Sequence, residues 1–70
     1  MQQFDLRSAR KRRRMDQVTL AQKSGVNQST VSRAERGAKP TPETIAALED
    51  ALGLKPGQLV FGAPQQAAVA

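Results

Sequence analysis

Glycine and proline divide this 70-residue chain into short segments, and each segment has the composition of a helix. Apolar residues recur at helical spacing, and no segment alternates apolar and polar residues as a half-buried strand does. Gly25, Gly37 and Gly53 each follow such a segment, where a helix commonly ends in the left-handed conformation. The sequence therefore predicts an all-α fold, and a chain of this length forms one domain at most.

The segment boundaries predict five helices. They span residues 4–14, 17–24, 28–36, 42–52 and 56–61. Asp16, Asn27 and Thr41 precede the second, third and fourth helices, where their side chains can cap the first backbone N–H groups. Residues 63–70 contain no charge, periodicity or cap, so we expect a flexible C-terminal tail after a domain of residues 1–62.

The composition lacks the residue types most often used for catalysis and metal binding. The chain contains no cysteine and no histidine, which excludes disulfides, thiolate metal sites and the most common general base. No serine lies in a nucleophile elbow, and no glycine loop is suited to phosphate binding. The absence of cysteine also fits a reducing cytosol. We therefore predict that the protein is not an enzyme and uses no metal and no cofactor.

The positive charge is concentrated near the N-terminus. Eleven Lys and Arg residues against six Asp and Glu give a net charge of +5, and residues 7–14 contain six of these cations. Such a distribution suits a polyanionic partner. The run at residues 10–14 is open to three interpretations: a solvated helix face, a phosphate-contacting surface or a localisation signal. Phe4 and Phe61 are the only aromatic residues, which argues against stacking of single-stranded bases.

The segment from Gln17 to Gly37 has the pattern of two helices joined by a short turn. It reads QVTLAQKSGVNQSTVSRAERG, and residues 25–27 provide a turn of the length found in helix-turn-helix motifs. Ala21 is small where the two helices would cross, and Gly25 adopts a left-handed backbone conformation at low cost. This segment therefore predicts a helix-turn-helix.

The stretch from Leu6 to Phe61 resembles the DNA-binding domain of phage repressors and Cro proteins, the XRE-like helix-turn-helix family. Three features carry the resemblance: the spacing of Arg10 from Gln17, the pair Leu20-Ala21, and the sequence Glu35-Arg36-Gly37. The resemblance implies the family's five-helix, lambda-repressor-like fold. The chain departs from the family's pattern at Arg14, where glycine is common, and at Asp16, where serine or threonine is common.

The resemblance also implies roles for individual residues. The residues expected to read base edges in the major groove are Gln28, Ser29 and Arg33. Their chemistry agrees, because glutamine can pair with adenine, arginine with guanine, and serine with either. The residues expected to contact phosphates are Gln17, Asn27, Ser32, Arg36 and Lys39. Arg10 and Glu35 are expected to form a structural ion pair.

The function implied by the resemblance is sequence-specific binding of double-stranded DNA by a transcriptional regulator, more narrowly a repressor. One recognition helix reads few base pairs, so we expect a homodimer on a palindromic operator. The possible dimer contacts are Pro56, Leu59, Val60 and Phe61. We expect a cytoplasmic, nucleoid-associated protein of bacterial or phage origin, with no membrane or small-molecule partner. The alternatives are an antitoxin, which would bind a toxin protein as well as its own promoter, and a non-specific architectural DNA binder.

Overall fold

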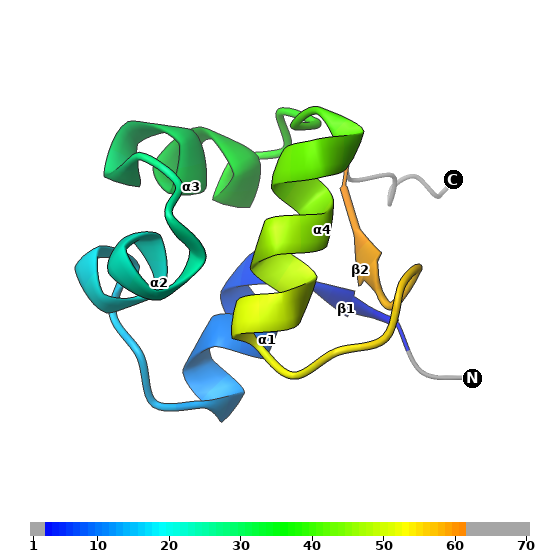
Figure 1. The fold of residues 1–70 in the computed structure, drawn as a ribbon, viewed down its shortest axis with the longest axis horizontal. Helices are drawn as coiled ribbons and strands as arrows, with labels where there is room; N and C mark the ends of the chain where they lie inside the picture. The colour runs from blue at the N-terminus through cyan, green and yellow to red at the C-terminus, as the bar shows by residue number, and fades with distance from the viewer. Residues whose placement is uncertain (1–2, 62–70) are drawn as a thin grey trace.

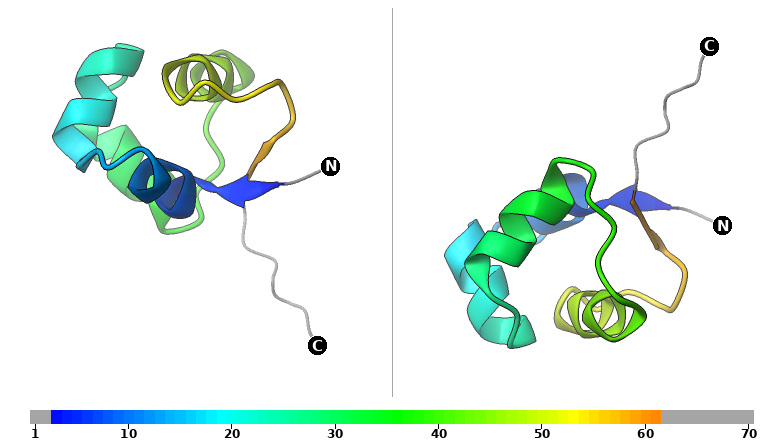
Figure 2. Two further views of the ribbon diagram at one scale, coloured as in Figure 1. Left: turned by 90° about the horizontal axis from the view of Figure 1, so that it is seen from below. Right: turned by 90° about the horizontal axis from the view of Figure 1, so that it is seen from above.

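The computed structural model describes residues 3–61, which form four helices and one pair of short strands (Figure 1). In chain order the elements are β1 (Phe4–Asp5), α1 (Leu6–Arg12), α2 (Gln17–Ser24), α3 (Gln28–Glu35), α4 (Pro42–Ala51) and β2 (Leu59–Val60). Figure 2 shows α3 nearest the viewer from above and α1 nearest from below, so these helices face different sides of the domain. The prediction of a mostly helical fold is confirmed, but five helices are not present among the described residues.

Side-chain caps set the starts of α2 and α4. The Asp16 carboxylate accepts a hydrogen bond from the Thr19 N–H at 2.7 Å, which caps α2 as predicted. The Thr41 hydroxyl accepts a hydrogen bond from the Thr44 N–H at 3.3 Å, and Pro42 follows in the first turn of α4. Both caps satisfy backbone donors that a helix leaves unpaired at its N-terminus.

The first helix is shorter at both ends than the sequence predicts. It begins at Leu6 rather than at residue 4, because β1 pairs with β2 instead. It ends at Arg12, and Arg14 follows with a φ of +57°, which lies in the left-handed region. The reversal at Arg14 lets the chain leave α1 and turn into α2.

The third helix also differs from its prediction. It ends at Glu35, and Arg36 is the residue that caps its C-terminus. Asn27 occupies the N-cap position, but its side chain accepts no hydrogen bond from the first turn. The predicted capping role of Asn27 is therefore wrong.

One core joins all four helices and β2. Leu6, Leu20, Val31, Leu48 and Leu52 are almost completely buried. Smaller side chains complete the buried cluster where elements approach closely, and they are Ala9, Ala21 and Ala34, with Leu59 from β2. The core thus takes Leu20 and Ala21 from α2, Val31 and Ala34 from α3, and Leu48 from α4.

The predicted fifth helix at residues 56–61 is wrong, and so is the expectation that the chain has no strand. Gly57 lies in a turn with a φ of +91°, and Leu59 and Val60 form β2. β2 runs parallel to β1, and the Phe4 N–H donates to the Gln58 carbonyl at 2.8 Å. The Gln58 N–H donates to the Lys55 carbonyl at 3.1 Å, so this segment forms a turn that leads into a strand and not a helix.

Glu49 explains why the segment after α4 turns. Its side chain is buried, and one carboxylate oxygen accepts hydrogen bonds from the Gly57 N–H at 2.8 Å and the Leu59 N–H at 3.4 Å. A buried carboxylate needs such donors, because burial without partners is costly. Glu49 thus holds the turn and the start of β2 against α4.

The predicted flexible tail at residues 63–70 lies outside the described residues. Among residues 3–61, no helix has the length and apolar character needed to cross a membrane.

Candidate nucleic-acid interface

The turn between α2 and α3 is closed by the backbone. The N–H groups of Gly25 and Val26 both donate to the Ala21 carbonyl, at 2.9 and 3.1 Å. Gly25 has a φ of +74°, a conformation that costs a residue with a Cβ atom more than it costs glycine. Ala21 in α2 and Val31 in α3 are buried in the core. This geometry is that of a helix-turn-helix, as the sequence predicts.

The exposed face of α3 carries the three side chains predicted to read bases. Gln28, Ser29 and Arg33 are all exposed, whereas Val31 and Ala34 on the other side of the helix are buried. Within the described part of the chain, none of the three exposed side chains has a hydrogen bond or ion pair. Their donors and acceptors are therefore available to a ligand that approaches α3 from solvent.

The side chains predicted to contact phosphates surround this face. Asn27, Arg36 and Lys39 are exposed, and Ser32 is half-buried. A hollow of about 200 Å³ beside α3 lies between Arg33 and Lys39, and its other lining residues are Thr30, Ala34, Ala38 and Pro40. Two cations beside a shallow hollow suit an anionic group.

Sequence reasoning missed Thr30 as a member of this surface. Thr30 is half-buried and lines the hollow with Arg33, three residues later in α3. The signal was present in the sequence, because residues three apart on a helix lie side by side. The hydroxyl of Thr30 adds a donor and an acceptor next to the two cations.

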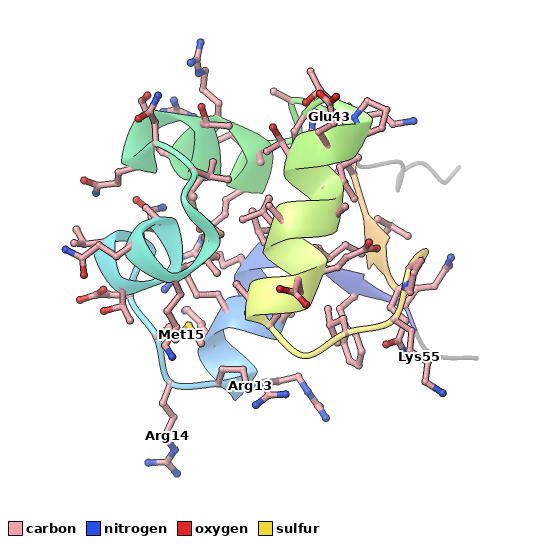
Figure 3. The ribbon with its side chains drawn as sticks, in the orientation of Figure 1. Arg13, Arg14, Met15, Glu43 and Lys55 are labelled. Carbon is pink, nitrogen blue, oxygen red and sulfur yellow. The ribbon has the colours of Figure 1, made fainter. Side chains whose placement is uncertain are left out.

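Arg10, Glu35 and Gln17 form a polar network that joins three helices. The Arg10 guanidinium donates to the Glu35 carboxylate at 2.5 and 3.1 Å, and the Gln17 amide donates to the same carboxylate at 3.1 Å. Arg10 also donates to the Met15 carbonyl at 2.8 Å, and Figure 3 shows Met15 between α1 and α2. The side chains of Arg10 and Glu35 are only 11% and 6% exposed. The hydrogen bond with Glu35 raises the pKa of Arg10, so the guanidinium stays charged.

The hydrogen bond to Glu35 limits the contacts that the Gln17 side chain can make at the interface. One N–H of its amide is directed to Glu35, which leaves the second N–H and the amide oxygen for other partners. A phosphate contact by Gln17 would therefore start from a side chain already held in place. The network also positions the N-terminus of α2, whose backbone donors favour anions.

Asp16 places a negative charge at the same helix end. The hydrogen bond from the Thr19 N–H holds the pKa of the Asp16 carboxyl below its ordinary value, so the group is ionised at neutral pH. The stability that this cap contributes is present above the ordinary carboxyl pKa and is lost as the pH falls through the lowered value. An exposed carboxylate here is mildly repulsive to a nearby phosphate.

Comparison with protein families identifies the family to which this chain belongs. The helix-turn-helix family matches residues 6–59, which is most of the chain and includes the whole surface described above. The chain belongs to the Cro and phage-repressor type, the XRE-like helix-turn-helix family. No curated protein and no solved structure matches it. The family is one of DNA-binding regulators of transcription and is typically not enzymatic, so double-stranded DNA is the partner of this helix-turn-helix protein.

The residues predicted as dimer contacts of the helix-turn-helix protein have different environments. Leu59 is buried in the core and is closed to a partner, whereas Pro56 is exposed. Val60 is 39% exposed, which makes it one of two large apolar side chains exposed in the described region, and Phe61 is half-buried. Val60 and Phe61 border an open hollow of about 500 Å³ between α4 and β2.

Proposed function

We propose that this helix-turn-helix protein is a sequence-specific repressor of transcription that places α3 in the major groove of its operator. The observation that carries the proposal is the exposed face of α3, where Gln28, Ser29 and Arg33 lie together with no hydrogen-bond or ion-pair partner among residues 3–61. A helix fits the major groove, and these side-chain types can distinguish its base edges. We place the protein in the cytoplasm, bound to the nucleoid.

Phosphate contacts would fix the position of α3 in the groove. Asn27 precedes α3, Ser32 lies on it, and Arg36 and Lys39 follow it. They therefore flank the base-reading face. Gln17 and the N-terminus of α2 would contact the neighbouring phosphate strand. Such contacts set register and orientation without reading sequence. The protein would repress by occupying DNA that the transcription machinery needs.

We infer that the protein reads its operator as a homodimer. A single α3 contacts too few base pairs to select one site among the many in a genome. Val60 is an exposed apolar side chain, Phe61 is half-buried, and both border the hollow beside β2. These features support a two-fold contact there, with Pro56 at its edge. No observation on residues 3–61 favours the antitoxin alternative, so we do not propose it.

Base reading is tested by selecting binding sites from random duplexes at a stated salt concentration. We expect Gln28→Ala and Arg33→Ala each to lose about 1–3 kcal/mol of specific binding and to relax the preference at one or two base pairs. Arg36→Ala is the matched control, because a phosphate contact should weaken all duplexes about equally and reduce the salt slope by about one. Unchanged site preferences in both Gln28→Ala and Arg33→Ala would show that α3 does not read the operator.

The dimer is tested by rotating one half of the selected site relative to the other. In a two-fold complex the half-sites lie on one DNA face, about 34–36 Å apart. Insertion of half a helical turn between them should lower the affinity to that of an isolated half-site. Insertion of a whole turn should lower the affinity less. Footprinting at matched protein concentrations measures both. Equal affinity for all three spacings would mean that the protein binds as a monomer.

A further inference from the structure

The C-terminal end of α1 carries a cluster of four consecutive exposed cations. We call Lys11, Arg12, Arg13 and Arg14 the α1 cluster. Figure 3 shows Arg13 and Arg14 at the lower end of the molecule, with Arg14 directed away from it, whereas α3 lies at the upper end. Figure 2 agrees, because α1 is nearest the viewer from below and α3 nearest from above. The α1 cluster thus faces away from the base-reading surface.

The length of α4 gives a scale for this separation. Figure 3 shows Glu43, in the first turn of α4, at the α3 end of the molecule and Arg13 at the other end. The Arg13 guanidinium lies against Gly53, just beyond the C-terminus of α4. α4 has ten residues, which corresponds to about 15 Å along its axis. α3 thus lies beside one end of α4, whereas Arg13 lies at the other end (Figure 3).

The side chains of the α1 cluster form no ion pair with the described residues. The ion pair of Arg10 with Glu35 is the single one among residues 3–61. Lys11 and Arg14 have no side-chain partner in the described region, and Arg12 lies over the Phe4 ring at 4.9 Å through its guanidinium. Four adjacent like charges repel one another, and no described carboxylate pairs with them. These charges are therefore available to an anionic partner.

Arg14 also has an unusual backbone conformation for a residue that is not glycine. Its φ of +57° makes it the one residue other than glycine with a positive φ in the described chain. A residue with a Cβ atom adopts this conformation at a cost, whereas glycine adopts it freely. Backbone strain of this kind concentrates at functional positions. A cation therefore occupies a position where glycine would give a more stable fold.

We propose that the α1 cluster binds the phosphate backbone of a second DNA duplex, so that the protein bridges two DNA segments. The proposal rests on the proposed DNA-binding function of α3. The surface suits DNA better than an acidic protein, because the two large exposed apolar side chains of the described region, Val18 and Val60, lie outside the cluster. Protein interfaces depend on apolar anchors, whereas DNA interfaces are polar and strongly positive.

The test uses the full chain bound to its selected operator duplex on a bead, followed by a free labelled duplex of unrelated sequence. Wild-type protein should retain the free duplex, with retention that falls steeply as salt rises. Lys11→Gln combined with Arg14→Gly should reduce retention about tenfold and leave operator affinity within about twofold, because two phosphate contacts are lost on one side only. Arg7→Gln combined with Lys23→Gln is the matched control, since it removes the same net charge from exposed positions elsewhere.

Single substitutions at Arg14 separate charge from folding. Arg14→Gly should raise Tm, by about 4 °C, because it relieves the positive φ, and should still weaken retention of the free duplex. Arg14→Lys should keep retention near the wild-type level. If a variant is more stable than the wild type and still retains less of the free duplex, unfolding does not explain the lower retention.

Several results would overturn the proposal. Equal retention by the two double variants would assign the effect to net charge alone. Loss of operator affinity in parallel with retention would place the α1 cluster on the same duplex as α3. Retention of polyglutamate in place of the free duplex would identify an acidic polypeptide as the partner. Failure to select any operator would refute the proposed function instead, and retention of unrelated duplexes by the protein alone would still report on the cluster.

Discussion

Glu35→Ala is expected to lower the free energy of unfolding by about 3–5 kcal/mol, the largest effect of any single substitution considered for this protein. The mutation would leave the Arg10 guanidinium, which is 11% exposed, without its carboxylate partner. It would also remove the acceptor of the Gln17 amide. Equilibrium unfolding in urea, followed by circular dichroism at neutral pH, measures the change. A domain of this size has little stability to spare, so we expect the variant to be partly unfolded at 25 °C.

A double variant tests the reason given for this loss. Arg10→Met combined with Glu35→Leu removes both charges and should recover much of the stability, because no buried charge is left unpaired. Glu35→Gln should lie between the wild type and Glu35→Ala, since its amide oxygen can still accept from Arg10. An unchanged unfolding midpoint in Glu35→Ala would mean that the pair is solvated in solution.

Glu49→Ala is expected to cost about 2–3 kcal/mol, because the backbone N–H groups of Gly57 and Leu59 would lose their acceptor, and the bond to Leu59 is buried. Hydrogen exchange should show the local effect, with faster exchange of the Phe4 N–H as the pairing of β1 with β2 weakens. Glu49→Gln keeps an acceptor and should lose less.

The neighbouring Asp50 provides the control for Glu49. It lies on the same helix but is exposed, so Asp50→Ala should change stability by no more than about 0.5 kcal/mol. If Glu49→Ala and Asp50→Ala behaved alike, the carboxylate of Glu49 would not hold the turn.

The parts of the fold that depend on local chemistry could be predicted from the sequence. The Asp16 and Thr41 caps and the left-handed Gly25 follow from residue type and position along the chain. The helix-turn-helix and its exposed face on α3 follow from apolar spacing and from resemblance to a family. The residues of the proposed interface needed no knowledge of distant contacts, since they lie close together in the sequence.

The parts that were missed depend on contacts between distant residues. The pairing of Phe4 with Leu59 overrides the helical pattern at both ends of the described chain. The Glu49 carboxylate holds the turn after α4 through hydrogen bonds. No pattern in the neighbouring sequence predicts that this carboxylate is a buried acceptor. The residue type of Arg14 argues against a positive φ, and only the glycine that is common here in the family indicates one.

The strand pair also orders the events of folding. α2, its turn and α3 are close in sequence, so they can associate with little loss of chain entropy. β1 and β2 close a loop that contains every helix, and such distant contacts form late. Leu59, which completes the core, is also among the last residues of the domain to leave the ribosome. α2 and α3 can therefore assemble on the nascent chain, and the sheet fixes them to the rest of the domain only once synthesis has passed β2.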